Sequence, residues 1–368
     1  MNNFCVFILT HGRPDRVITW NTLRKSGYDG QVFLVVDNED DSWQEYVNKF
    51  GAENVIFFDK RETAKRFDEF DNFDNRSTIV YARNECFEIA RKLGYKYFLE
   101  LDDDYVCFGF RMRGIMETER TSSWLQINYV LTGLFPAMVE MFEAAGAMSI
   151  AFSQGGDWMD GTGEGFSRRK CMNTFFCSTA RPFSFVGRIN EDVNTYTWFQ
   201  SMGNLFLTIP FIQITQKQTQ TNAGGMSSIY LNQGTYVKSF YTIICSPSCV
   251  KIKIMGSTNR RMHHKVDWGT AVPMIISEDF RKGERKMVVH TPPVRPRGLM
   301  TVAEINSLIE LPPARVKPAA KPAKRPQKSK QLVTIPAAPK KEFDQYYWKK
   351  QGIGTDRPAW DISNLKPV

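Results

Sequence analysis

The stretch Tyr97-Phe98-Leu99-Glu100-Leu101-Asp102-Asp103-Asp104 decides how this sequence is read. Its first five residues are mostly apolar, and such a compact run predicts a short buried β-strand. Three consecutive carboxylates follow at the carboxyl end of that strand. Because neighbouring like charges repel, we expect a cation to neutralise them, and a divalent metal ion is the usual one. The stretch therefore predicts a metal site that handles a phosphorylated substrate, with a non-catalytic calcium or helix-capping loop as the alternative.

The sequence on the amino-terminal side of this stretch alternates between strand and helix patterns. Short apolar runs predict strands, and segments with apolar residues at three- and four-residue steps predict helices. The predicted strands are 4–9, 31–36 and 55–58. The predicted helices are 15–26, 43–50 and one that ends at 93 and that Ser77 or Thr78 would cap. This alternation favours an α/β fold with a mostly parallel central sheet flanked by helices. Since ligands bind at the carboxyl ends of such strands, we expect His11, Asp37 and Asp102 to share one edge.

The sequence beyond the acidic stretch is less regular. It predicts a long helix over 125–145, broken or begun near Pro136, a strand over 148–152, a helix over 193–202 and a strand over 205–214. Segments 173–181 and 183–186 are expected to be extended, and the polar segment 216–228 is typical of a lid. Phe175, Phe176, Phe183 and Phe185 fit either the core or a surface that stacks on a base.

The net charge of +9 is concentrated near the carboxyl terminus. Nine Lys or Arg residues and no acid lie between Arg315 and Lys341; subtracting them from the 48 basic residues leaves as many basic as acidic residues, 39 of each. The same stretch is rich in Ala and Pro, which predicts a disordered linker without a core. A basic, flexible arm suits a polyanion such as DNA, although a plain solvated linker has the same composition.

Cysteine usage and hydropathy indicate a cytoplasmic protein. The seven cysteines are scattered without a paired C-x-x-C motif, which favours reduced thiols in the core. No apolar run approaches the roughly 18 residues of a membrane span, and the start of the sequence does not have the pattern of a signal peptide. We therefore expect no membrane association.

Several charged residues outside the acidic stretch are candidates for the same site. Arg83-Asn84, in the first turns of a predicted helix, could face a diphosphate or base, while Lys60, Arg61 and Arg76 could neutralise phosphate. His263-His264 is the one paired histidine site, and either imidazole could complete a metal shell. Glu191-Asp192 opens a predicted helix, where one carboxylate could act as general base or could simply favour the helix start.

This combination resembles the GT-A glycosyltransferases: Asp37 at a strand tip, Arg83-Asn84, Asp102-Asp103-Asp104 as a D-x-D motif, Glu191-Asp192 and a late histidine. The opening Phe7-Ile8-Leu9-Thr10-His11-Gly12-Arg13-Pro14, together with Asp71-Asn72-Phe73, more narrowly resembles the TET-associated phage glycosyltransferases. The resemblance covers about 1–294 and implies sugar transfer to 5-hydroxymethylpyrimidines of DNA. It implies a GT-A-like domain over 1–298, divided into a nucleotide-sugar half (1–108) and an acceptor half (109–298). A linker (299–342) and an aromatic segment (343–368) would follow.

The resemblance also implies a role for each candidate residue. The donor, expected to be a UDP-sugar, would contact Thr10, His11, Arg13, Asp37, Arg76, Arg83, Asn84 and Asp103. Asp102 and Asp104 would bind Mn²⁺ or Mg²⁺, with His264 or His263 closing the metal shell. Asp192, beside Glu191, would be the base of an inverting displacement. The doubled histidine leaves that ligand open, and a retaining reaction remains an alternative.

Other functions fit parts of the same pattern. A glycosyltransferase could act on a glycan or a protein instead of DNA, which the basic stretch mildly disfavours. A nucleic-acid-binding protein could keep a degenerate sugar-nucleotide fold, although the intact acid triplet argues against decay. A nucleotidyltransferase would also use paired acids and a metal ion, and would release free pyrophosphate.

Overall fold

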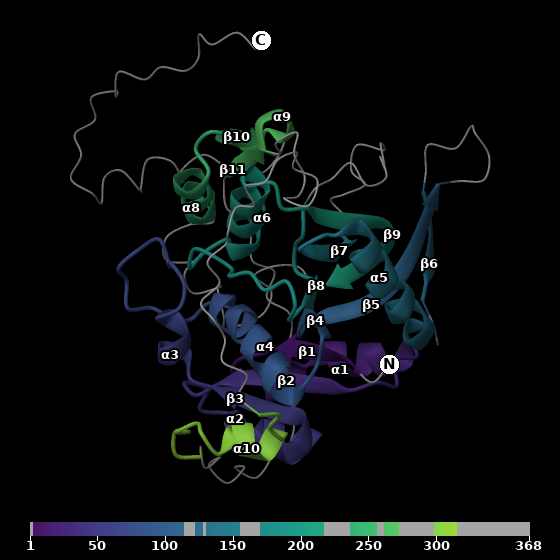
Figure 1. Ribbon diagram of the computed structural model, residues 1–368, viewed down its shortest axis with the longest axis vertical. Coiled ribbons are helices and arrows are strands. Elements are labelled where there is room, and N and C mark those ends of the chain that lie inside the picture. Colours follow the sequence, from purple (N-terminus) through teal and green to yellow (C-terminus); the bar gives the residue numbers. More distant parts are fainter. Residues whose placement is uncertain are drawn as a thin grey trace, which may run out of the picture. The chain divides into compact units, whose positions relative to one another are not determined.

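A nine-stranded sheet organises the chain, seen in a computed structural model that describes residues 3–113, 122–127, 130–154, 170–216, 236–255, 261–271 and 298–314 (Figure 1). Its strands are β1 (Phe4–Leu9), β2 (Val32–Asp37), β3 (Val55–Phe58), β4 (Tyr97–Asp102), β5 (Tyr105–Arg113), β6 (Ser122–Gln126), β7 (Ser149–Ser153), β8 (Phe175–Ser178) and β9 (Phe206–Gln216). A separate two-stranded sheet pairs β10 (Val250–Met255) with β11 (Arg261–Val266).

The strand order is β3-β2-β1-β4-β8-β7-β9-β5-β6. Strands β1 to β4 are parallel to one another, and β7 is parallel to β9. Strand β8 runs antiparallel to both of its neighbours, as does β5. All the other described strands of this sheet therefore run in one direction, which confirms the predicted mostly parallel α/β sheet.

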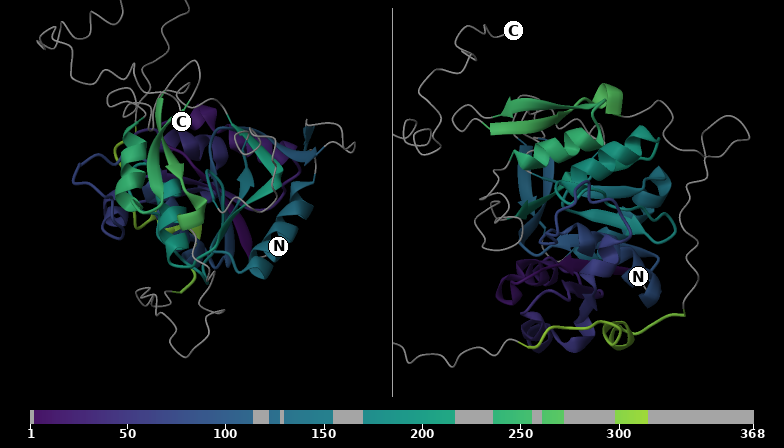
Figure 2. Two further views of the ribbon diagram at one scale, coloured as in Figure 1. Left: turned by 90° about the horizontal axis from the view of Figure 1, so that it is seen from above. Right: turned by 90° about the vertical axis from the view of Figure 1, so that its left-hand side faces the viewer.

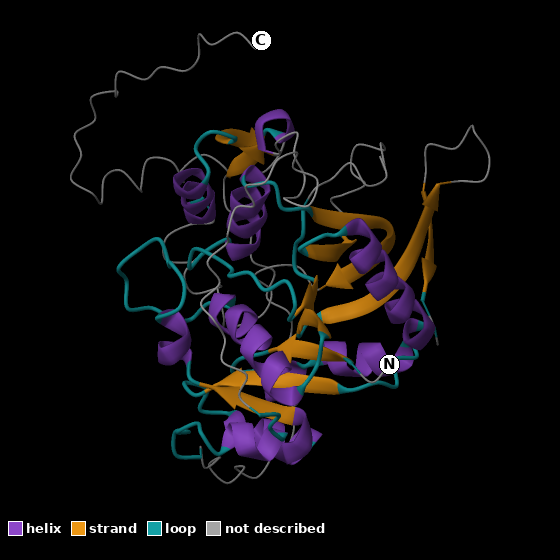
Figure 3. Cartoon of the chain, in the orientation of Figure 1, coloured by secondary structure: helices purple, strands orange, loops and turns teal. Residues whose placement is uncertain are grey.

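Helices cover both faces of the sheet, as Figure 3 shows. The helical elements are η1 (Pro14–Arg16), α1 (Ile18–Lys25), α2 (Trp43–Phe50), η2 (Ala52–Asn54), α3 (Lys60–Ala64), α4 (Val80–Leu93), α5 (Leu131–Ala145), α6 (Glu191–Ser201), α8 (Val237–Cys245), α9 (Trp268–Ala271) and α10 (Val302–Asn306). Successive side chains of a strand point to opposite faces. Phe4, Val6 and Ile8 accordingly pack with α1, α2 and α5, while the alternate residues of β1 pack with α4 and α6.

The predicted elements agree with the structure through β4 and diverge later. The expected helix over 125–145 is wrong at its start, because β6 extends to Gln126 and α5 begins only at Leu131. Pairing of Leu125 with Phe110 of β5 draws that segment into the sheet. The polar segment 59–75 contains α3, which the sequence did not predict, and 183–186 belongs to no strand.

Residues 298–314 form a strap along the outer strand of the sheet, which differs from the predicted linker start at 299. The side-chain amide of Asn306 accepts from Phe57 N (2.8 Å) and donates to Val55 O (2.7 Å), so it pairs with the free edge of β3. Ile305 is buried on one face of the sheet, and Ile309 and Leu311 pack on the other. These apolar side chains bind the strap to the body, and the right-hand view of Figure 2 shows the yellow-green strap with α10 against the purple and blue elements of the chain, where α10 contacts β3.

The remaining predictions divide between described and undescribed residues. All seven cysteines are free thiols, six of them buried, as expected for a reduced core. The four phenylalanines Phe175, Phe176, Phe183 and Phe185 are buried core residues. Within the described ranges, no helix is both long enough and apolar enough to cross a membrane. The basic stretch 315–341, the aromatic segment 343–368 and residues 217–228 of the expected lid lie outside the described residues.

Candidate functional site

A pocket of about 210 Å³ lies at the carboxyl ends of β1 to β4, where a mostly parallel sheet is expected to bind ligands. Strand ends supply most of its wall, and the start of α4 supplies the rest. The lining residues are Leu9, Thr10, His11, Arg13, Asp37, Phe58, Lys60, Ser77, Thr78, Ile79, Ala82, Asp102, Asp103 and Asp104. The structure thus brings together seven of the predicted site residues, drawn from the ends of β1, β2 and β4.

Asp37 anchors a charged pair on one side of the pocket. Its Oδ2 lies 2.7 Å from Nδ1 of His11, and its Oδ1 lies 3.0 Å from Nζ of the buried Lys60. Burial alone would raise the pKa of Asp37, but the His11 hydrogen bond and the Lys60 charge hold it below its ordinary value. Burial would lower the pKa of His11, and Asp37 instead raises it. Because both Asp37 oxygens are engaged, His11 is the group of this pair that presents itself to a ligand.

Asp103 lines the pocket, but it is buried and its side chain is held by other residues of the protein. Its Oδ2 accepts from Thr10 Oγ1 (2.7 Å) and forms an ion pair with Arg13 Nε (3.3 Å). Its backbone carbonyl accepts from the first amides of α1, those of Ile18 and Thr19. Burial raises the pKa of Asp103 to about 6, despite the Arg13 charge. The side chain of Asp103 therefore holds the turn between its two neighbours in shape.

Asp102 and Asp104 are the two acids of the triplet with the alternate spacing expected of metal ligands. Burial, followed by the charges of Asp102 and Asp103, raises the pKa of Asp104 to about 7. Burial also raises the pKa of Asp102, although Arg83 opposes the shift. Among the described residues, the three carboxylates of the triplet form ion pairs with only two cations, Arg83 and Arg13. Two carboxylates in such surroundings fit a divalent cation that also binds a diphosphate.

Arg83 connects this pocket to a second group of acids. It is 2% exposed, its Nη2 donates to Asp102 Oδ1 (3.0 Å), and its Nε donates to Glu191 Oε1 (3.0 Å). Its Nη1 lies 3.5 Å from Glu100 Oε2, and its guanidinium centre lies 4.8 Å from the Phe175 ring. The prediction that Arg83 contacts the donor is therefore corrected: it is enclosed behind Asp102 and orients that carboxylate.

Glu191 and Asp192 are the first two residues of α6, as predicted. Both are buried, and Asn190 precedes them in a left-handed conformation (φ 61°). Asp192 Oδ1 accepts from the amide of Val193 (2.7 Å), so the helix start helps to hold its charge. Burial and the charge of Asp192 raise the pKa of Glu191 to about 7, and burial raises the pKa of Asp192. Such a pair near neutral pH can accept a proton.

A family model for the TET-associated glycosyltransferases matches residues 4–225, which include the whole pocket and the acid pair. The chain belongs to the TET-associated glycosyltransferase family. It is accordingly a glycosyltransferase enzyme, built on the mostly parallel α/β sheet that the sequence predicted.

Solved structures that resemble this TET-associated glycosyltransferase are distant in sequence. One is glucosyl-3-phosphoglycerate synthase from Mycobacterium tuberculosis in complex with Mg²⁺ and UDP: 7% identity, TM-score 0.39, 72% of this chain and 87% of that chain covered. Another is residues 1–349 of S. aureus TarS in complex with UDP-GlcNAc: 11% identity, TM-score 0.38, 66% of each chain covered. None of the curated proteins matches the sequence.

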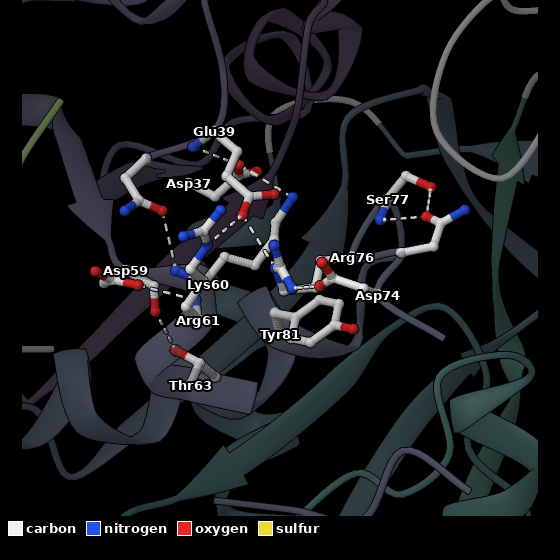
Figure 4. A network of polar contacts seen from close by, with 12 residues as sticks. Asp37, Glu39, Asp59, Lys60, Arg61, Thr63, Asp74, Arg76, Ser77 and Tyr81 are labelled. Atoms are coloured by element: carbon white, nitrogen blue, oxygen red, sulfur yellow. Dashed lines mark hydrogen bonds and ion pairs between the residues drawn. The ribbon is translucent and has the colours of Figure 1, made fainter. Parts of the chain in front are cut away.

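Two predicted donor contacts of this family member are engaged elsewhere. Asn84 pairs through both ends of its amide with the backbone of Phe185, at 3.0 and 2.8 Å, and does not line the pocket. Arg76 lies beyond the pocket wall, where it donates to Glu39 Oε1 (3.0 Å) and contacts Asp74, as Figure 4 shows. In the structure, Asn84 holds the Phe185 backbone by hydrogen bonds, and Arg76 joins the segments of Glu39 and Asp74 by ion pairs.

The two histidines predicted as metal ligands lie on β11, in the separate hairpin that packs on α8. Neither lines the pocket, and no group of three or more metal-binding side chains occurs within the described ranges. Burial, helped by His263, lowers the pKa of His264 to about 3. The predicted aspartate–histidine metal site is therefore not assembled in this structure, because the hairpin belongs to a different sheet.

Sequence reasoning missed or underrated three residues of the site. Glu100 is the one charged residue inside β4, between apolar neighbours and before the terminal Asp102, and that position was the available signal. Lys60 directly follows the residue after β3, although it was considered only as a weak phosphate ligand. Thr78 was expected to cap a helix, yet its buried hydroxyl makes no hydrogen bond and lines the pocket.

Proposed function

We propose that this enzyme transfers a sugar from a nucleotide-sugar donor, a UDP-sugar, to 5-hydroxymethylcytosine-type bases of DNA. One observation carries the proposal: Arg83 joins Asp102, in the pocket at the strand ends, to the buried acid pair that opens α6. A donor site and a proton acceptor are thereby held by one buried cation, as a sugar transfer requires.

The pocket lining has an apolar part and a polar part, and this division supports nucleotide binding. Leu9, Phe58, Ile79 and Ala82 make an apolar part that suits a nucleobase, with the unpartnered hydroxyl of Thr78 beside it. His11 and Arg13 bring basic side chains to the polar part, where Arg13 is held by its ion pair with Asp103 (3.3 Å). In this proposal, Thr10, Asp37 and Asp103 hold these groups in place rather than contact the donor themselves.

Asp102 and Asp104 would hold Mn²⁺ or Mg²⁺ in this proposal. When bound, the ion would supply Lewis-acid stabilisation of the leaving diphosphate. Arg83 favours the ionised form of Asp102, against the larger effect of burial, and orients this carboxylate through the 3.0 Å contact. Asp192 would take the proton from the hydroxymethyl group of the acceptor, and Glu191, bonded to Arg83, would fix the position of the acid pair. An in-line displacement by that hydroxyl inverts the sugar carbon.

The acceptor is tested with the unaltered protein. Duplex DNA containing 5-hydroxymethylcytosine is incubated with a panel of UDP-sugars and Mn²⁺, and the mass of the released bases is followed. We expect one donor to add one sugar to the modified base, with none added to unmodified cytosine DNA. Absence of any base adduct, together with transfer to a glycan or protein in the same reaction, would refute the DNA acceptor.

A further inference from the structure

Phe73 is an exposed aromatic side chain on a turn that is otherwise firmly held. It is 65% exposed, more than any other aromatic side chain within the described ranges. A single exposed apolar residue needs no explanation by itself. The hydrogen-bonded turn beneath the ring and the buried cation beside it do need an explanation.

Asp71 and Arg188 hold the turn that carries Phe73 through hydrogen bonds. Asp71 Oδ1 accepts from the Phe73 amide (2.9 Å), while Asp71 Oδ2 accepts from Arg188 Nε (2.8 Å) and contacts the Tyr241 hydroxyl. Arg188 Nη1 donates to the carbonyl of Asn75 (3.3 Å), which closes the turn on its other side. The turn is therefore set before any ligand arrives, and little conformational entropy would be lost on binding.

The guanidinium of Arg188 also supports the ring directly. Its side chain is 3% exposed, and its central carbon lies 5.6 Å from the centroid of the Phe73 ring. The cation thus lies against the ring from inside the protein, while most of the ring surface faces solvent. A flat apolar surface presented in this way suits one planar ring of a ligand.

The position of the turn links the two halves of the proposed reaction. Ser77 and Thr78, which follow the turn, form part of the donor pocket. On its other side, the amides of Gly187 and Arg188 donate to Asp68 O (2.8 Å) and Glu69 O (2.9 Å). Arg188 precedes Glu191 by three residues. Phe73 is therefore tied to the donor wall and to the segment that leads into the acid pair.

We propose that Phe73 stacks on a base of the DNA acceptor and so determines acceptor binding. This inference rests on the proposed function, because it takes the acceptor to be a nucleobase. Every base has a π-face, and stacking on an aromatic side chain is a recurrent way to hold an unstacked base. In this proposal Phe73 contacts the acceptor, and it does not line the pocket proposed for the donor and the metal ion.

The test compares Phe73→Ala, Phe73→Leu and Phe73→Trp with the unaltered protein. Leucine keeps apolar bulk without a π-face, and tryptophan enlarges that face. The control is Leu308→Ala, which truncates an apolar side chain of similar exposure (61%) on the strap. Two quantities are measured: the KM for hydroxymethylcytosine DNA in sugar transfer, and the Kd for UDP with Mn²⁺ by calorimetry, which needs no acceptor.

We expect alanine and leucine to raise the KM for DNA on the order of 10-fold, as the loss of one stacked base would. Tryptophan should keep the KM near that of the unaltered protein, and no variant should change the Kd for UDP. If leucine or alanine leaves the KM for DNA unchanged while the unaltered protein modifies DNA, this inference alone is overturned. If the unaltered protein adds no sugar to DNA, the proposed function fails first, and the inference fails with it.

Discussion

Asp104 is the acid of the triplet whose charge is least neutralised by neighbouring cations. Within the described residues it has no salt bridge, whereas Asp102 contacts Arg83 and Asp103 contacts Arg13. Among the three acids, a bound cation would therefore gain most from Asp104. Loss of that carboxylate should affect the reaction far more than the fold.

We predict that Asp104→Ala lowers turnover by at least about 100-fold, because a metal ligand contributes several kcal/mol at the transition state. The variant should unfold at nearly the same temperature as the unaltered protein. UDP with Mn²⁺ should stabilise the unaltered protein only when both are present, and should not stabilise the variant. Asp41→Ala, at an exposed acid outside the pocket, is the matched control. Full activity in Asp104→Ala would reject the metal assignment.

Arg83 is the one cation among the buried acids Glu100, Asp102 and Glu191. Arg83→Met should therefore cost about 3–5 kcal/mol of unfolding free energy, because it leaves buried acids without a counter-charge. Glu100→Gln should be tolerated. Thermal unfolding monitored by circular dichroism measures both, and equal destabilisation by the two changes would contradict this account.

The raised pKa of Glu100 predicts how the stability of Glu100→Gln, relative to the unaltered protein, changes with pH. Burial raises its pKa from 4.5 to about 8, so the folded protein keeps a proton that the unfolded chain has already lost. Folding stability from this group is therefore present at low pH and falls as pH rises between those values. The unfolding temperature of Glu100→Gln, relative to the unaltered protein, should increase from pH 5.5 to pH 8.5.

Sequence patterns found the pocket acids because each follows an apolar run at a strand end. They could not distinguish a cation that faces a ligand from one enclosed by acids, which is why Arg83 was assigned to the donor. Asn84 was misplaced for a related reason: only the tertiary structure brings the Phe185 backbone to both ends of its amide. Thr78 offered no signal beyond its place before a helix.

At the scale of elements, α8 lies against α6 and brings Lys238 towards the acid pair. The Lys238 charge lowers the pKa of Asp192, against the larger effect of burial. We predict that Lys238→Met shifts the acidic limb of the pH–rate profile to higher pH, because Asp192 then holds its proton more tightly. Lys251→Met, on the exposed face of β10, should leave the profile unchanged. A shift to lower pH would contradict the assignment of Asp192 as base.

The strap offers a second test at this scale. Asn306→Ala removes two hydrogen bonds to β3 and leaves a backbone donor and a backbone acceptor unpaired at the sheet edge. We expect a loss of about 1–3 kcal/mol in the free energy of unfolding by urea. Glu310→Ala, at an exposed position of the same strap, should change it little. Equal stability of the two variants would show that the edge contact contributes nothing.

Elements with local signals were predicted well, and those that depend on distant partners were not. Strand β3 and helix α2 have the predicted bounds, because their apolar residues and flanking polar residues are contiguous. The last two residues of strand β6, Leu125 and Gln126, were predicted as helix, since their strand character comes from pairing with β5. The strap was read as linker because its apolar residues are widely spaced between prolines and polar residues.

For the whole molecule, the compact unit that contains the pocket ends at Val316, before most of the basic stretch. A chain ending at Val316 should therefore keep its unfolding temperature and its affinity for UDP with Mn²⁺. Its affinity for DNA should fall, and the slope of log affinity against log salt concentration should become shallower, because fewer phosphates are neutralised. Fluorescence anisotropy at several salt concentrations measures both. An unchanged slope would mean that the basic stretch does not bind DNA.

The strand order also governs how this protein can be made. β4 and β5 are separated by two residues, yet β5 pairs with β9, whose last residue is Gln216. On the ribosome, strands β1 to β4 can associate as they emerge and β5 can pair with β6, but β9, the other partner of β5, is complete only about a hundred residues after β5 ends. Within that interval, the free side of β4 stays unpaired until β8 (Phe175–Ser178) is made. Nascent chains stalled in this interval should be the form most in need of a chaperone.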